Sequence, residues 1–225
     1  MNIALFGGTF DPVHAGHLAA ARAARRRFRL DKVLFIPTGN PPHKTHDHLT
    51  DYAQRYAMVS LACAGEPGLT PSTIEAPTAD GSPRYSIDTV RAIERKLRRT
   101  DRLYFLLGVD AFLDLPLWKE FRRLLDSVEF IVVSRPGFDA SAIRKVAPPD
   151  LRSSRRLSPG AGTIGLRHGA IHILGGVDAP VASRDIRQAV RARQAMTGLV
   201  PPLVEEYILK EGLYRPGATR RRLKR

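Results

Sequence analysis

Short apolar runs alternate along this chain with segments in which apolar residues recur at the spacing of one helix face. The strand-like runs are Ile3–Phe6, Val33–Pro37, Leu69–Ile74, Leu103–Gly108, Phe130–Ser134 and Ile171–Leu174. The helical positions between them are Leu18, Ala21, Ala24 and Phe28, then Tyr52, Tyr56, Val59 and Cys63, then Ile87, Val90, Ile93 and Leu97. This alternation predicts an α/β fold, with an open, mostly parallel sheet and helices on both of its faces.

The residue pattern also marks helix ends and loops. Thr50 and Ser86 are expected to cap the second and third helices, because a hydroxyl oxygen can accept from the free N–H groups of a first turn. A last helix is expected over 201–211, since two prolines stand at its start and Gly212 at its end. Residues 147–168 are rich in Pro, Ser, Arg and Gly and are predicted to form a long loop.

A glycine-rich turn with two histidines follows the first strand and opens the first helix. It is Gly7-Gly8-Thr9-Phe10-Asp11-Pro12-Val13-His14-Ala15-Gly16-His17. Glycine lets the backbone turn sharply and approach a ligand, and the free N–H groups and dipole of a helix start attract anions. His14 and His17 share one side of that first turn, where imidazoles can donate to phosphoryl oxygens. The turn therefore predicts a phosphate site, and the lack of a third ligand or a cysteine argues against structural zinc.

Other candidate residues follow predicted strands in the same way. The segments are 41–44 after the second strand, Gly108–Asp110 after the fourth, and 183–187 after the last. Carboxyl ends of parallel strands meet at one edge of an open α/β sheet, and ligands bind there where the strand order switches. The pattern predicts that these segments converge on one cleft.

Composition narrows the setting without deciding the function. The chain has 225 residues and a single cysteine, Cys63, so it forms no intrachain disulfide and a reducing cytoplasm is the expected location. No signal-peptide pattern is present, and no apolar run approaches the roughly 20 residues of a membrane span. We therefore expect no membrane partner.

The net charge of +14, from 36 Lys and Arg against 22 Asp and Glu, is compatible with nucleic acid or with small anionic substrates. The basic residues gather on the first helix, in one loop and in the tail: Arg22, Arg25, Arg26, Arg27 and Arg29; Arg152, Arg155 and Arg156; Arg220, Arg221, Arg222, Lys224 and Arg225. No stacking aromatics lie among them, as single-strand binders require. A solvated surface is the preferred interpretation, and a nucleic acid partner is disfavoured.

The turn with the two histidines resembles the signature of the nucleotidyltransferase superfamily. Further segments in order resemble the bacterial nicotinate-nucleotide adenylyltransferase family: Pro41–Lys44, Tyr85–Thr89, Gly108–Phe112, Leu115–Trp118, and Leu199 to Tyr214. The similarity runs from residue 2 to about 214. It implies a Rossmann-like fold with a small C-terminal helical subdomain, and transfer of an adenylyl group from ATP to nicotinate mononucleotide with release of pyrophosphate, a step of NAD biosynthesis.

The resemblance also implies roles for individual residues. The expected catalytic residues are His14, His17, Lys44 and Arg187. The expected ATP-binding residues are Gly7, Gly8, Thr9, Phe10, His17, Gly108, Asp110, Ser183 and Arg187. Nicotinate mononucleotide would be bound by His43, Lys44, Tyr85, Ser86, Asp110 and Trp118, with Trp118 stacked on the pyridine ring and Ser86 facing its carboxylate. Mg²⁺ is expected to be carried by the ATP phosphates rather than by a dedicated carboxylate cluster.

Two segments depart from the family pattern. Ser86 stands where the family usually has Thr, Arg84 where it has a small residue, and the loop from Glu75 to Tyr85 is longer. These changes leave the preference for an acid over an amide acceptor open, and Arg84 is hypothesised to strengthen it. In the last motif, Ala182 and Arg184 replace hydroxyl residues, and Arg184 either contacts a phosphate or points to water.

Residues 1–180 are expected to form the Rossmann-like core, 181–214 a helical segment that completes the ATP site, and 215–225 a basic, flexible tail. Three other functions remain open: a sister nucleotidyltransferase with nicotinamide mononucleotide, phosphopantetheine or glycerol phosphate as acceptor; a nucleotide-sensing module without turnover; and a nucleic-acid-binding protein. The sequence leaves a homo-oligomer open as well.

Overall fold

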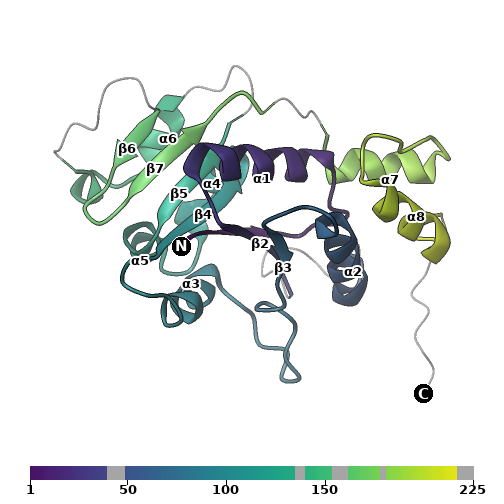
Figure 1. The fold of residues 1–225 in the computed structure, drawn as a ribbon, viewed down its shortest axis with the longest axis horizontal. Helices are drawn as coiled ribbons and strands as arrows, with labels where there is room; N and C mark the ends of the chain where they lie inside the picture. Colours follow the sequence, from purple (N-terminus) through teal and green to yellow (C-terminus); the bar gives the residue numbers. More distant parts are fainter. Residues whose placement is uncertain (40–48, 135–139, 154–161, 178–180, 217–225) are drawn as a thin grey trace.

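The computed structural model describes residues 1–39, 49–134, 140–153, 162–177 and 181–216. In these ranges the strands are β1 (Asn2–Gly8), β2 (Lys32–Pro37), β3 (Leu69–Pro71), β4 (Arg102–Gly108), β5 (Glu129–Val133), β6 (Thr163–Gly165) and β7 (Ala170–Leu174). The helices are α1 (Ala15–Phe28), α2 (Tyr52–Cys63), α3 (Ser86–Glu94), α4 (Val109–Leu113), α5 (Phe121–Ser127), α6 (Ala140–Val146), α7 (Ser183–Arg191) and α8 (Pro202–Glu211), with the 3-10 turns η2 (Leu115–Leu117) and η3 (Pro149–Leu151). The strands form one sheet between layers of helices (Figure 1).

The sheet confirms the predicted α/β architecture. Its order in the described residues is β3-β2-β1-β4-β5-β7-β6, and every pairing is parallel except that between β6 and β7. The chain builds outward from β1 to β3 and then returns, so that β4 lies on the other side of β1. Because Phe6 is paired with Leu106, Gly8 and Gly108 end neighbouring strands at the same edge. That edge is the switch point at which open α/β sheets bind ligands.

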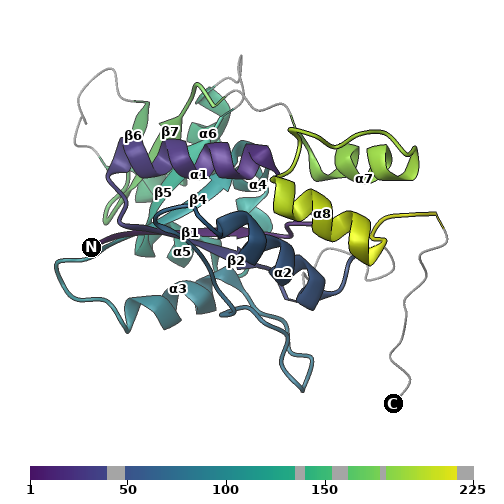
Figure 2. The same cartoon turned by 45° about the vertical axis from the view of Figure 1, so that its right-hand side comes forward.

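The two faces of the sheet bury separate apolar cores. Ala4 and Phe6 of β1 point toward α1 and α2, whereas Ile3 and Leu5 point toward the face covered by α3, α4 and α5. Successive strand residues point to opposite faces, so a continuous apolar run is what a strand buried on both sides requires. Figure 2 shows α1 above the sheet and α3 below it.

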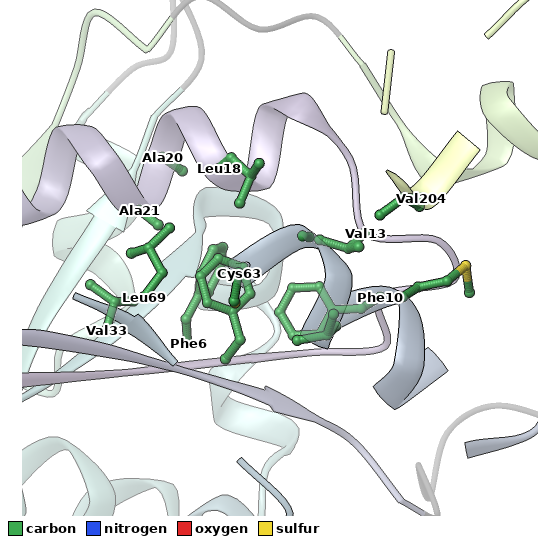
Figure 3. Packing of buried hydrophobic residues seen from close by; sticks show 14 of the residues in the cluster. Phe6, Phe10, Val13, Leu18, Ala20, Ala21, Val33, Cys63, Leu69 and Val204 are labelled. Atoms are coloured by element: carbon green, nitrogen blue, oxygen red, sulfur yellow. The ribbon is translucent and has the colours of Figure 1, made fainter. Parts of the chain in front are cut away.

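The C-terminal helices α7 and α8 lie together at one end of the molecule, and α8 packs against α2 (Figures 1 and 2). Val204 of α8 belongs to the same apolar cluster as Val13 and Leu18, and Figure 3 shows the three side chains near the start of α1. The amide of Ala15 donates to the carbonyl of Leu199 at 2.9 Å. The helical subdomain therefore shares the core of the sheet. Its expected boundary near residue 180 and the tail from 217 onward lie outside the described residues.

Several local predictions were wrong. The third strand ends at Pro71 rather than Ile74, because proline has no N–H to continue a ladder. Residues 147–168 are not all loop: η3 and β6 lie within them, and β6 is formed by antiparallel pairing with β7 rather than by an apolar run of its own.

The expected helix caps are each displaced by one residue. Helix α2 is preceded by Asp51 rather than Thr50, and α3 by Tyr85 in an extended conformation, so that Ser86 is already the first helical residue. The last predicted helix does end at Gly212, whose φ of 64° is in the left-handed region favoured by glycine. Within the described ranges, none of the helices combines the length and apolar character needed to cross a bilayer.

Candidate functional site

His14 and His17 lie together at the carboxyl end of β1. His14 precedes the first residue of α1, and its backbone N–H donates to Nδ1 of His17 at 3.2 Å. The two imidazole rings are stacked, with centroids 3.6 Å apart. Because Nδ1 of His17 accepts this bond, its proton is on Nε2, which makes that nitrogen a hydrogen-bond donor. The predicted pairing of the two histidines on the first helical turn is confirmed.

Both imidazoles are neutral at pH 7 in the absence of a ligand. Burial lowers the pKa of His14 to about 4, although the charge of Asp185 on α7 opposes the shift. Burial also lowers the pKa of His17 well below its usual value, and the nearby His14 lowers it further. Nδ1 of His14 is buried and has no hydrogen-bond partner among the described residues. An anion bound here would reverse part of these shifts, because it favours the protonated imidazole.

Helix α7 brings two predicted residues to the same turn. Nη1 of Arg187 donates to the carbonyl of Asp11 at 2.6 Å, and the hydroxyl of Ser183 donates to the carbonyl of Pro12 at 2.9 Å. Ala182 occupies the helix cap, and the hydroxyl of Ser183, the first residue of α7, ties the helix to the turn. His14, His17 and Arg187 therefore converge as predicted. The side chain of Arg184 is 83% exposed, and its Nε lies 3.6 Å from Oδ1 of the neighbouring Asp185.

Arg55 holds the turn in place, although it was not among the site residues predicted from the sequence. The residue is only 1% exposed, and its guanidinium donates to the carbonyls of Thr9 at 2.8 Å, Thr50 at 2.9 Å and Gly39 at 3.5 Å. Burial lowers its pKa, while the nearby carboxylate of Asp11 raises it. A single arginine in an amphipathic helix gave no signal, because the carbonyls that it satisfies belong to distant loops.

Asp11 is buried and has partners on both carboxylate oxygens. The hydroxyl of Tyr214 donates to Oδ1 at 2.7 Å, and the backbone N–H of Thr50 donates to Oδ2 at 3.3 Å. Burial beside this carboxylate raises the pKa of Tyr214, so the phenol stays protonated and remains a donor. The C-terminal segment thus closes over the turn, and Asp11 acts inside the protein rather than toward a ligand.

The predicted glycines Gly7, Gly8 and Gly108 lie at the same edge of the sheet as this turn. Of the predicted residues that follow them, Phe10 lies in the core and Asp110 at the surface. A Cβ on Gly108 would meet nothing within 4 Å, and both Gly108 and Asp110 are exposed. A Cβ on Gly8 would lie 3.0 Å from the Phe10 ring, and Phe10 is buried against Phe35 and His17. The Phe10 ring thus supports His17 from the core side. Gly7 and Gly8 are the last two residues of β1, and Thr9 lies in the turn.

The predicted acceptor residues lie beyond β4. Trp118 is half-buried, with its ring edge-on to Phe105 of β4 at 6.0 Å between centroids. Nζ of Lys119 lies 4.3 Å from the centroid of the Tyr85 ring and 3.4 Å from Oδ2 of Asp88, which joins the η2–α5 segment to the start of α3. Tyr85, Ser86 and Trp118 are therefore brought to one region, as expected. His43 and Lys44 lie outside the described residues.

Within the described part of the chain, no group of three or more His, Cys, Asp or Glu side chains is arranged to hold a metal ion. The buried carboxylate closest to the histidines along the chain, Asp11, already has a donor on each oxygen. The donors that face the turn are imidazole and guanidinium groups, which suit anionic ligands. The site is chemically suited to phosphate groups.

A doubly wound sheet with a glycine turn and basic donors at its switch point defines a nucleotide-binding α/β protein. Residues 5–189 match the cytidylyltransferase-like family model. A relative from Moorella thermoacetica described as a probable nicotinate-nucleotide adenylyltransferase is 40% identical over 214 residues, covering 95% of this chain and 92% of its own. A relative of the same description from Pelobacter propionicus is 38% identical over 215 residues, covering 95% and 98%. The chain belongs to the nicotinate-nucleotide adenylyltransferase family.

Solved structures support the fold. Plasmodium falciparum nicotinic acid mononucleotide adenylyltransferase in complex with NaAD superposes with a TM-score of 0.68 over 95% of this chain and 97% of that one. A putative nicotinate-nucleotide adenylyltransferase from Vibrio parahaemolyticus gives a TM-score of 0.62, with coverages of 95% and 94%. Each is 18% identical to this chain, so the likeness concerns the fold alone.

Proposed function

We propose that this protein transfers the adenylyl group of ATP to nicotinate mononucleotide, giving nicotinate adenine dinucleotide and pyrophosphate, a step of NAD biosynthesis. The observation that carries the proposal is the convergence of the stacked pair His14 and His17 with Arg187, which lies at least 170 residues away along the chain. Family membership at 40% identity over nearly the whole chain agrees with it. The buried state of Cys63 suits the reducing cytoplasm, the compartment that we propose.

In the proposed reaction, an oxygen of the acceptor 5′-phosphate attacks the α-phosphorus of ATP in line with the leaving group. A new P–O bond forms, the bond to the bridging oxygen breaks, and pyrophosphate leaves with the electron pair. The attacking phosphate is already an anion, so no strong base is needed. Catalysis then depends on alignment of two polyanions and on donors aimed at the developing charge.

Residue roles follow from where the donors lie. Nε2–H of His17 would donate to the ATP phosphates, and His14 would gain a partner and a higher pKa when they bind. The bond from Arg187 to Asp11 uses one of the five N–H donors of the guanidinium, so the group can hold the turn and still face the triphosphate. Lys44 remains a proposed phosphate ligand on the evidence of the sequence motif.

The other predicted contacts would complete the ATP-binding part and the acceptor-binding part of the site, which are called its two halves below. The backbone of Gly7, Gly8, Thr9 and Phe10, together with Gly108 and Ser183, is proposed to line the ATP half. Asp110 is proposed to accept from ribose hydroxyls, and His43, Tyr85, Ser86 and Trp118 to bind the acceptor. A carboxylate at Ser86 would meet the N–H groups of the first turn of α3, which attract anions.

Mg²⁺ is proposed to be carried by ATP oxygens and water, as is usual for this ion in phosphate chemistry. It would neutralise charge on the triphosphate. The imidazole and guanidinium donors described above are cations or neutral donors, so they would bind the anionic phosphates rather than the metal.

The test is pyrophosphate release from MgATP with each acceptor supplied separately. We expect turnover with nicotinate mononucleotide and slower or no turnover with nicotinamide mononucleotide, phosphopantetheine or glycerol phosphate. ATP binding without release of pyrophosphate from ATP, whichever acceptor is supplied, would support a sensing module instead. Binding of nucleic acid that falls steeply with salt, without turnover, would support the nucleic-acid alternative.

A further inference from the structure

Glu75 is a buried carboxyl group to which no part of the reaction has been assigned. It lies in the segment between β3 and α3, is 6% exposed, and accepts a hydrogen bond from the hydroxyl of Thr89 at 2.8 Å. Thr89 belongs to α3 and is itself buried. A buried carboxyl is rare unless it has a structural or functional reason, because burial penalises its charged form.

The surroundings place this carboxyl beneath the proposed acceptor site. Thr89 follows Ser86 by three residues, so these two side chains are neighbours on the surface of α3, with Cβ atoms about 5–6 Å apart, and Tyr85 immediately precedes the helix. On the other side, a Cβ on Gly39 would lie 2.1 Å from the Glu75 carbonyl oxygen. The backbone at Glu75 is therefore pressed against the turn after β2, and its side chain is directed at α3.

Glu75 changes its charge near neutral pH. Burial raises its pKa to about 7, while the Thr89 hydrogen bond and the nearby cation Arg84 act in the opposite direction. The charge of Glu75 contributes to raising the pKa of the Tyr52 phenol on α2. Arg55, also on α2, lies over the Tyr52 ring and donates to the carbonyl of Gly39.

We propose that Glu75 sets the selectivity of the site between an acid and an amide acceptor. When the Glu75 carboxyl is protonated, it carries no charge that would repel a pyridine carboxylate bound at the start of α3. When it is ionised, two like charges lie about one helical turn apart, which disfavours the acid and leaves the neutral amide unaffected. The inference rests on the proposed function and adds to it the residue that sets the substrate preference.

The experiment is the ratio of kcat/KM for nicotinate mononucleotide to that for nicotinamide mononucleotide, at saturating MgATP, from about pH 5.5 to about pH 8.5. Both acceptors carry the same 5′-phosphate, so its titration cancels in the ratio. We expect the ratio to fall roughly tenfold as the pH rises through about 7, the size of a like-charge repulsion in a partly buried site. In Glu75→Gln, an isosteric neutral side chain, the ratio should be high and independent of pH.

Thr89→Val provides a second variant that keeps Glu75. Loss of the hydroxyl removes a bond that favours the ionised carboxylate, so the inflection should move to higher pH, whereas Thr89→Ser should leave it in place. A flat ratio in the wild-type enzyme, or the same inflection in Glu75→Gln, overturns the role of Glu75 while the proposed function stands. Failure of the wild-type enzyme to use either acceptor overturns both.

Discussion

The turn after β1 and the start of α3 lie at the same edge of the sheet but are held in different ways. The turn is fixed from two directions, by the buried Arg55 of α2 and the half-buried Arg187 of α7, and the hydroxyl of Tyr214 donates to the Asp11 carboxylate. At the start of α3, the side chains of Arg84, Tyr85 and Ser86 are exposed or half-buried, and Glu75 is a buried group bonded to Thr89 of the same helix. A rigid turn suits alignment of phosphates, which is common to all acceptors, whereas a less constrained helix start suits selectivity.

The largest effect is expected from His17→Ala, in the part of the site proposed to bind the ATP phosphates. Removal of a preorganised donor to the developing charge should lower kcat by about 10²–10³-fold. The acid-to-amide ratio should not change, because the substitution lies in the half that both acceptors share. Pyrophosphate release measures kcat, and thermal unfolding reports whether the fold persists.

His168→Ala is the matched control. His168 is a surface residue hydrogen-bonded to Asp126, away from the turn, so its removal should leave kcat near the wild-type value. A His17→Ala enzyme with almost full kcat would contradict the assignment of the stacked pair to phosphate binding.

Arg55→Met tests whether the turn depends on buried donors. The substitution keeps much of the apolar stem but leaves the carbonyls of Thr9 and Thr50 without their donor. Each unsatisfied buried carbonyl costs about 1–3 kcal/mol, so the free energy of unfolding should fall by about 3 kcal/mol. Urea unfolding measures the change, and Arg99→Met, at an exposed position, should stay within about 0.5 kcal/mol of wild type. A loss as small as that of the control would show that the donors do not hold the turn.

This difference between the two halves also explains what the sequence could predict. The described strands other than β6, the glycine turn and the last helix were predicted because each is specified locally, by apolar runs or by glycine and proline. Arg55 and Tyr214 were missed because their partners lie 46 and 203 residues away along the chain. Buried polar contacts of this kind appear only once the fold has brought the loops together.

Errors of prediction fell where tertiary contacts outweigh local preference. β6 forms because β7 offers an antiparallel partner, and its three residues carry no strand pattern. Ser86 was expected as a cap, but Tyr85 takes that position, which leaves the hydroxyl in the first turn of α3. Glu75 gave no signal either, since a glutamate in a polar loop is ordinarily exposed.

Trp118→Ala tests the part of the site that is proposed to bind the acceptor. If the indole stacks on the pyridine ring, its loss should raise the KM for nicotinate mononucleotide roughly tenfold, within the range of about 1–3 kcal/mol per stacked base, while the KM for ATP is unchanged. Leu117→Ala is the control, because that neighbouring side chain is 73% exposed. An equal rise in both KM values would point to a loss of packing against Phe105 instead of lost stacking.

The smallest effect is expected from Arg84→Ala. The pH determines whether the acid-to-amide ratio reflects the direct attraction by Arg84 or its effect on the pKa of Glu75. Arg84 is exposed and precedes the start of α3, so attraction of the acceptor carboxylate is screened by water and its loss should lower the acid-to-amide ratio only about two- to fivefold. The same cation lowers the pKa of Glu75, so near pH 7 its removal also protonates Glu75 and raises the ratio. At about pH 6 Glu75 is mostly protonated in both enzymes, and the direct effect is isolated. Arg95→Ala, at the other end of α3, is the control. An unchanged ratio at that pH rules out Arg84 as a determinant and leaves the preference to Glu75.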